Sequence, residues 1–169
     1  MVIRRMDEGD VEPVIELMLG NYDGVLAEYH SPQVLARSRA RVTPETLREW
    51  MGWKRVYVVE DEDGIVATGS LADFGSEGQP KLSISQLFVR SNLHGQGIGR
   101  RLATHLIETA RSIGAEKLHV PSTRNAIGFY RRLGFQPDLE RPDPADETTW
   151  MTMDVPLPPS RHPRRIPSN

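Results

Sequence analysis

Apolar and polar residues alternate along the chain in patterns that predict a series of strands and helices. "VIRRM" at the start is typical of an edge strand, and a helix is expected over residues 11–18, with a proline in its first turn. The stretch "GNYDGVLAEYHSP" that follows is rich in turn residues and predicts a loop. A second helical region is expected over residues 32–50, broken at "VTPE", where Thr43 caps a new turn that Pro44 opens.

The middle of the chain predicts three strands. "RVYVVEDEDGIVATGSLADF" holds two β-branched runs, residues 56–59 and 65–71, and their acidic, glycine-containing connection is typical of an antiparallel hairpin. "LSISQLFV" then predicts a further strand. Simple alternation assigns its side chains to two faces, one with Ser83, Ser85, Leu87 and Val89 and the other with Leu82, Ile84, Gln86 and Phe88.

The last part of the pattern predicts two helices and two strands. Apolar residues recur at helical spacing over residues 98–113, and Gly114 supplies a natural stop. "EKLHV" predicts a strand that the helical crossover makes parallel to "LSISQLFV". "TRNAIGFYRRLGF" predicts a short helix ending at Gly134, and "TTWMTMDV" predicts a strand that closes the sheet after a proline-rich loop. The expected fold is α+β, with helices on a mixed, mostly antiparallel sheet.

Length and charge divide the chain into one domain and a tail. With 169 residues, a single domain over residues 1–155 is expected. Residues 156–169, "PLPPSRHPRRIPSN", carry three arginines, no acidic residue and five of the thirteen prolines, which predicts a disordered tail. The net charge of −2 therefore leaves about −5 for residues 1–155. An acidic body argues against general nucleic-acid binding.

The residue types that are missing also restrict the function. Without cysteine the chain has no disulfide, no thiolate metal site and no cysteine nucleophile, and we expect no metal centre. The start, "MVIRRMDEGD", lacks a signal-peptide core, and no apolar run approaches the roughly 18 residues that span a bilayer. We therefore expect a cytoplasmic protein that does not act at a membrane.

One glycine-rich stretch carries the main chemical signal. In "FVRSNLHGQGIGRRLATHL", Gly95, Gly97 and Gly99 lie between an expected strand and the start of an expected helix. Unpaired amides at a helix start attract an anion, and missing side chains let a pyrophosphate approach the backbone. Arg100 and Arg101 add positive charge at the rim. The stretch predicts a phosphate-bearing ligand.

Two common nucleotide sites do not fit this stretch. A P-loop requires GK[ST], whereas Gly99 is followed by two arginines. A dinucleotide fingerprint requires GxGxxG and a carboxylate about 20 positions later. The spacing here is GxGxG, and residues 118–124, "LHVPSTR", contain no carboxylate. The stretch is therefore neither a P-loop nor a dinucleotide-binding fingerprint.

Two motifs resemble the GNAT superfamily of N-acetyltransferases. "HGQGIG" is similar to the family's [QR]xxGx[GA] turn, with His94 where Gln or Arg is usual, and "NAIGFYRRLGF" is similar to its N…A..FY..LGF stretch. His94 is either a ligand of the anion or a solvent-facing loop residue. The resemblance implies a three-layer GNAT fold with a central mixed sheet, splayed parallel fourth and fifth strands, and helices on both faces.

The resemblance also implies a reaction and a set of site residues. The expected reaction transfers acetyl from acetyl-CoA, the acyl donor, to a primary amine of a small molecule or peptide by direct attack in a ternary complex. Tyr130 is implied to hydrogen-bond or protonate the departing thiolate, and Ser85 faces the reacting groups. The implied coenzyme A contacts are Leu87, Phe88, Val89, His94, Gly95, Gln96, Gly97, Ile98, Gly99, Arg100, Asn125 and Tyr130. Without the motif, Tyr130 and its neighbour Phe129 would be ordinary core aromatics, and Asn125 a helix-start residue.

The sequence leaves the general base open. Ser83, Ser85 and Gln86 occupy the strand positions where many relatives carry a carboxylate or histidine, and none is a base at neutral pH. Either a water chain through the hydroxyls carries the proton or a group from elsewhere reaches in. The candidates for such a group are Glu28, His30, Asp73 and His119.

Two loops carry the residues from which we predict the class of acceptor. The carboxylates Asp23, Glu28, Asp73 and Glu77 would make an acidic rim, which favours a cationic acceptor such as a polyamine, an aminoglycoside or a protein amine. The same carboxylates would also simply keep the protein soluble. A catalytically weak acyl-CoA-binding regulatory module, a longer acyl donor and a homodimer, which is frequent among relatives, stay open as alternatives.

Overall fold

A seven-stranded mixed sheet organises the computed structural model, which describes residues 1–141 and 147–156. In spatial order its strands are β1 (Val2–Arg5), β2 (Arg55–Asp61), β3 (Gly64–Asp73), β4 (Leu82–Val89), β5 (Lys117–Ser122), β7 (Thr149–Asp154) and β6 (Gln136–Pro137). Neighbours pair antiparallel except β4 and β5, which are parallel. The predicted edge strand, hairpin and parallel crossover are confirmed.

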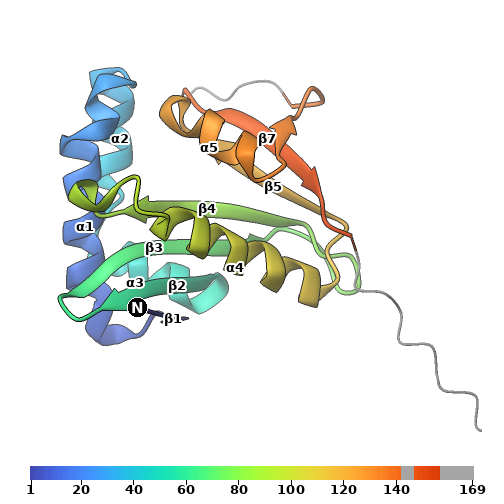
Figure 1. Cartoon of the computed structure of the whole chain (residues 1–169), viewed down its shortest axis with the longest axis horizontal. Helices are drawn as coiled ribbons and strands as arrows, with labels where there is room; N and C mark the ends of the chain where they lie inside the picture. Colours follow the sequence, from blue (N-terminus) through green and yellow to red (C-terminus); the bar gives the residue numbers. More distant parts are fainter. Residues whose placement is uncertain (142–146, 157–169) are drawn as a thin grey trace, which may run out of the picture.

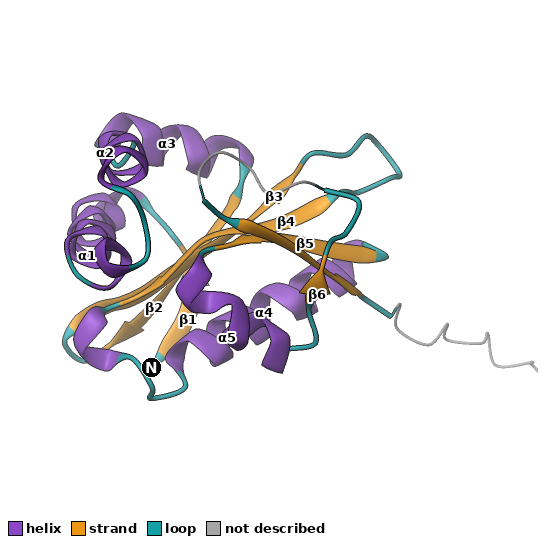
Figure 2. Ribbon diagram, turned by 90° about the horizontal axis from the view of Figure 1, so that it is seen from above, coloured by secondary structure: helices purple, strands orange, loops and turns teal. Residues whose placement is uncertain are grey.

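Helices cover both faces of this sheet (Figures 1 and 2). One face carries α1 (Val11–Asp23), α2 (Pro32–Ala40) and α3 (Pro44–Trp53), and the other carries α4 (Ile98–Ile113) and α5 (Ile127–Arg132). Short 3₁₀ turns span Glu8–Asp10, Val25–Glu28, Ser91–Leu93 and Arg124–Ala126. Each face has its own apolar core, so the structure has three layers, as predicted.

The helix α1 is longer than its sequence pattern indicates. Residues 20–23 belong to the predicted loop, yet α1 continues to Asp23. Asn21 explains the extension, since its buried side-chain amide donates to the Leu17 carbonyl oxygen at 3.0 Å and to the Val89 carbonyl oxygen at 3.0 Å. A residue typical of turns thus stabilises the last turn of α1 and ties it to the end of β4.

The predicted alternation along β4 is wrong after Ser85. Ser85 pairs with Ser70 of β3, but the next register pair is Phe88 with Thr68, so the strand bulges at this point. Gln86 adopts φ 49° within the bulge. Because a bulge adds one residue, the side chains beyond it change faces. The face toward α4 accordingly holds Leu82, Ile84, Leu87 and Val89, whereas Phe88 packs toward α1.

The two parallel strands separate soon after they begin. Their register contains only two pairs, Leu82 with Leu118 and Ser83 with His119. From Ile84 onward β4 remains paired with β3 and diverges from β5. This divergence is the splay that the family resemblance implied, and it leaves β4 backbone groups facing a gap.

The far end of the sheet differs in detail from expectation. The "TTWMTMDV" strand does not close the sheet, because β7 lies between β5 and the two-residue strand β6. The core reaches Val155, which is 2% exposed and donates its N–H to the Glu116 carbonyl oxygen at 2.8 Å. The predicted tail, apart from Pro156, lies outside the described residues. Among the helices of the described ranges, none has the length and apolarity needed to cross a bilayer.

Candidate active site

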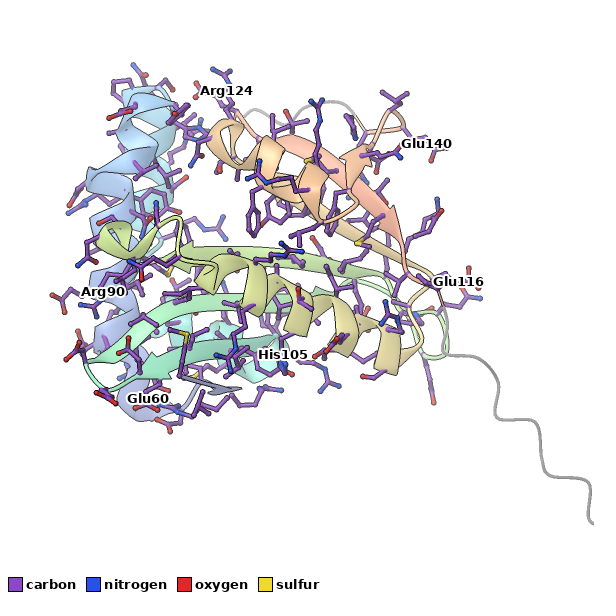
Figure 3. The ribbon with its side chains drawn as sticks, viewed as in Figure 1. Glu60, Arg90, His105, Glu116, Arg124 and Glu140 are labelled. Atoms are coloured by element: carbon purple, nitrogen blue, oxygen red, sulfur yellow. The ribbon has the colours of Figure 1, made fainter. Side chains whose placement is uncertain are left out.

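A cleft of about 590 Å³ opens where β4 and β5 diverge. Its walls come from β4, the glycine turn before α4, the end of β5, α5 and the first two helices. Arg90, which directly follows β4 (Figure 3), does not line it, because its guanidinium donates to the Ile65 carbonyl oxygen at 2.7 Å. The cleft therefore joins segments far apart in the sequence around one strand.

The glycine turn presents unpaired amides to this cleft. Gly95 and Gly97 adopt the left-handed φ values 78° and 82°, and Gly97 caps α4 without a side-chain hydrogen bond. The first amide bonded within the helix is that of Arg101, which donates to the Gly97 carbonyl oxygen at 3.0 Å. The preceding amides of α4 thus remain available to an anion.

The third glycine of the turn has a different role from the one expected. A Cβ atom at Gly95 or Gly97 would meet nothing within 4 Å. At Gly99 it would lie 3.3 Å from Val89 Cγ2 and 3.6 Å from Phe129 Cε2. Gly99 therefore also allows close packing of α4 against β4 and α5, in addition to lining the cleft.

His94 is held at the end of β4. Its exposed ring places Nε2 2.9 Å from the Val89 carbonyl oxygen, to which the Asn21 amide also donates. Both side chains fasten the strand end where the glycine turn begins. This contact gives His94 a structural role that neither of the two interpretations included. His94 also lines the cleft.

Tyr130 lies deep in the cleft wall. It is 5% exposed, and its ring makes edge contacts with Phe129 and Phe135 at centroid distances of 5.0 and 5.5 Å. Burial raises the pKa of the Tyr130 hydroxyl well above its usual value. The group therefore stays protonated and can donate a hydrogen bond into the cleft.

A polar cluster lies beneath the β4 bulge, and sequence reasoning missed two of its members, Ser70 and Lys54. Ser85 Oγ lies 2.9 Å from Ser70 Oγ, and Gln86 Oε1 accepts from Ser70 Oγ at 3.1 Å. Lys54 Nζ donates to Gln86 Oε1 at 2.9 Å and lies 3.4 Å from Ser85 Oγ. The sequence does contain a signal for Lys54. In "WMGWKRVYVV" this lysine follows two tryptophans and precedes an apolar strand.

The four expected base candidates are not equally placed. Only His30 lines the cleft, with Nδ1 3.4 Å from the Glu147 carboxylate. Asp73 accepts the amides of the loop after β3, and Glu28 is not part of the wall. His119 also lies outside the wall, where burial lowers its pKa and Asp138 is 3.6 Å away.

The expected acidic rim is wrong. None of Asp23, Glu28, Asp73 and Glu77 lines the cleft, and Asp23 forms an ion pair with Arg39. Within the described ranges the titratable side chains of the wall are two tyrosines, Tyr22 and Tyr130, and the basic residues His30, Arg41, His94, Arg100 and Arg132. No Asp or Glu from those ranges lines it.

The expected site residues do converge. All of them except the exposed Gln96 line the same cleft, namely Ser85, Leu87, Phe88, Val89, His94, Gly95, Gly97, Ile98, Gly99, Arg100, Asn125 and Tyr130. The residues expected to hold the donor and the residues expected to react thus share one cavity.

Comparisons with known proteins agree with this arrangement. Residues 25–135 match the sequence profile of the acetyltransferase (GNAT) family. The uncharacterized N-acetyltransferase YjgM of Escherichia coli strain K12 is 26% identical over 83 residues, which cover 47% of this chain and only half of that protein.

Solved structures share the fold. The PaiA N-acetyltransferase from Thermoplasma acidophilum, in complex with coenzyme A, superposes with a TM-score of 0.76 at 15% identity, over 90% of this chain and 98% of that one. N-acetylglutamate synthase from Neisseria gonorrhoeae, complexed with coenzyme A and N-acetyl-glutamate, gives 0.70 at 17% identity, over 91% of this chain and 35% of that one.

Proposed function

The chain belongs to the acetyltransferase (GNAT) family, and from this premise we propose that it transfers an acetyl group from acetyl-CoA to a primary amine of a small molecule or peptide. The observation that carries the proposal is that the start of α4, where the first amides have no partner within the helix, and the buried Tyr130 line one cleft. The coenzyme A complexes of structurally similar proteins support the choice of donor.

The donor fits the features of the cleft. The amides of Ile98, Gly99 and Arg100 would hold the pyrophosphate, with the Arg100 side chain and Asn125 beside it. The pantetheine arm would follow the edge of β4 that β5 leaves unpaired, because it offers amide groups that complete those hydrogen bonds. The thioester would then lie near the bulge at Gln86.

The chemistry requires attack by an uncharged amine and stabilisation of two developing charges. The amine nitrogen attacks the thioester carbonyl, backbone N–H groups of β4 stabilise the oxyanion, and the C–S bond breaks. Tyr130 donates a hydrogen bond to the departing thiolate. Because burial raises the pKa of Tyr130, hydrogen bonding rather than complete proton transfer is its role.

The acceptor half of the cleft restricts the amine. Its wall is largely apolar, and Arg41 at the end of α2 forms no ion pair within the described residues. A positively charged wall repels a second ammonium group and attracts an anion. We therefore favour a monoamine with an apolar body and an anionic group over a polyamine or an aminoglycoside.

Thiol release from acetyl-CoA, measured with the purified chain and a panel of amines, tests this function. Amine-dependent release of coenzyme A supports the proposal. The alternative of a regulatory acyl-CoA-binding module requires binding of coenzyme A with no release in the presence of any amine. The same assay with longer acyl-CoA donors decides the chain length.

A further inference from the structure

Lys54 is a buried cation without a carboxylate partner in the described ranges. It directly follows α3 and is 7% exposed, and its Nζ atom lies 4.5 Å from the Trp50 ring centroid and 4.9 Å from that of Trp53. Lysine is rarely buried to this extent unless it is paired or has a chemical role. Among the residues that the structure describes, the polar side chains that Lys54 contacts are those of Ser85 and Gln86 in the bulge.

The surroundings of Lys54 favour its uncharged form. Burial, and then the charge of Arg41, lower the pKa of Lys54 to about 8, against a smaller opposing effect of Glu49. The guanidinium of Arg5 on β1 also lies nearby, since it donates to the Lys54 carbonyl oxygen at 3.4 Å. The amine is therefore partly uncharged near neutral pH and able to accept a proton.

The hydrogen bonds of the cluster are compatible with both forms of the amine. An ammonium group donates to Gln86 Oε1 and Ser85 Oγ, and Ser85 then donates to Ser70 Oγ. An uncharged amine still donates to Gln86, while Ser85 turns its hydrogen toward the lone pair on Nζ. Rotation of one hydroxyl hydrogen is enough to change between the two arrangements.

We propose that Lys54 is the proton acceptor of the transfer reaction and that the Ser85 hydroxyl carries the proton to it from the acceptor nitrogen. The inference rests on the proposed acetyl transfer and supplies the base that β4 lacks. Ser85 lines the cleft and Lys54 lies behind it, so Ser85 meets the substrate and Lys54 acts through it.

The proton balance of this step is complete. After the amine has attacked, its N–H⁺ gives a proton to Ser85 Oγ as the hydrogen of Ser85 moves to Lys54 Nζ. Ser85 is restored, Lys54 becomes an ammonium group, the C–S bond breaks and the thiolate leaves. Lys54 then returns the proton to solvent, and coenzyme A takes up one proton as its thiol.

The pH dependence of Lys54→Arg tests the proposal. Arginine keeps the positive charge and the donors for Gln86 and Ser85, but it does not lose a proton in the accessible range. The acceptor probe is hydroxylamine, an amine that stays uncharged between about pH 6.5 and 9.5, the range that brackets the expected ionisation. Thiol release above the protein-free rate gives kcat/KM at each pH.

For the native chain, kcat/KM should rise with pH through an ionisation near 8, because the uncharged lysine is the active form. In Lys54→Arg the rate should fall by at least about tenfold at pH 8, and that rise should be lost. The control Lys117→Met, on the exposed partner of Asp154, should keep both the rate and the profile. An arginine variant with the native rate and profile overturns the proposal, since a purely structural lysine predicts that result.

A direct titration makes the test independent of turnover. Lys54, Lys81 and Lys117 are the three lysines of the chain, so ¹³C-lysine NMR of the whole protein resolves each one. A Lys54 signal that titrates near 8, well below the other two, supports the proposal. A Lys54 signal that titrates with the other two, at about 10.4, overturns it. Calorimetry with coenzyme A is the separate measure of the proposed function, because Lys54→Arg should not change its affinity.

Discussion

Tyr130 and Lys54 show how burial sets the chemistry of single residues. The same loss of water keeps the Tyr130 hydroxyl protonated and makes the Lys54 ammonium easier to deprotonate, because in each case the charged form is disfavoured. Tyr130 lines the cleft, whereas Lys54 lies behind Ser85, which lines the cleft in its place. In the proposed reaction, the donor for the leaving group and the acceptor for the amine proton would thus both depend on burial.

Removal of the Tyr130 hydroxyl should reduce turnover without disturbing the fold. Tyr130→Phe keeps the ring contacts with Phe129 and Phe135, and kcat should fall roughly 10- to 100-fold while the affinity for coenzyme A changes little. Steady-state kinetics and calorimetry measure the two quantities. The control is Tyr57→Phe, a buried tyrosine outside the cleft, which should retain native kcat. Equal kcat in all three proteins would contradict the role of Tyr130.

Asp10 should control acid stability. Asp10 is 5% exposed, and its carboxylate accepts from Arg4 at 2.7 and 2.9 Å, which holds the pKa of Asp10 below its usual value. A lowered folded-state pKa contributes stability above the unfolded value of about 3.9, and this contribution is lost as pH falls through the folded value. Asp10→Asn should therefore cost about 2 kcal/mol at pH 7 and progressively less below about pH 4.

Urea unfolding across that pH range measures the difference. The control is Glu60→Gln, which removes another carboxylate partner of Arg4, from a side chain that is 44% exposed. It should cost less than about 0.5 kcal/mol at every pH. A constant difference between Asp10→Asn and the native chain from pH 7 down to about 2 would contradict the assignment.

At the scale of elements, α4 provides a matched pair of glycines. Gly97 begins the helix with φ 82° and Gly114 ends it with φ 92°, and neither has an atom within 4 Å of a built Cβ. Alanine at either position should destabilise the fold by about 1 kcal/mol through backbone strain. Only Gly97→Ala should also weaken coenzyme A binding, by about tenfold, because only that end meets the pyrophosphate. If Gly97→Ala and Gly114→Ala bound coenzyme A with equal affinity, the pyrophosphate would not bind at the start of α4.

The sequence pattern predicted the elements whose signals are local. Thr43 accepts the Thr46 amide at 3.2 Å at the start of α3, and Gly114 ends α4 in the left-handed conformation, both as expected. Predictions from the apolar periodicity were wrong where a contact with a residue distant in sequence determines the local structure. Asn21 prolongs α1 by reaching β4, and the bulge at Gln86 depends on Lys54 and Ser70 from two other elements.

The candidate site was predicted to a similar extent. The glycine turn and the Tyr130 motif are continuous in sequence, and they line one cleft as expected. The proposed base was missed because Lys54 lies 31 residues from Ser85 along the chain. The prediction of an acidic rim was wrong because the sequence does not show which loop carboxylates form ion pairs with distant residues. Asp23, for example, pairs with Arg39.

At the scale of the whole molecule, the charges of the cleft oppose those of the chain. The sequence has a net charge of −2, yet the described wall of the cleft carries arginines and no carboxylate. The charges that line a cleft set the electrostatic potential inside it more strongly than the net charge of the chain does. The acceptor should therefore be chosen by Arg41 and its surroundings rather than by the overall charge.

A matched pair of amines tests this choice. Phenylalanine and phenethylamine differ by one carboxylate, and kcat/KM should be about five- to tenfold higher for phenylalanine, with spermidine the poorest acceptor. Arg41→Ala should remove the preference for phenylalanine, whereas Arg37→Ala, on the same helix but outside the cleft, should keep it. A preference for spermidine in the native chain would contradict the account.

The structure of the protein crystallised with coenzyme A tests the central claim most directly. The account predicts pyrophosphate oxygens within about 3.2 Å of the backbone nitrogens of Ile98, Gly99 and Arg100. It also predicts the thiol between Ser85 and Tyr130, in the gap between β4 and β5. Coenzyme A bound outside this cleft, or with its pyrophosphate away from the start of α4, would contradict it.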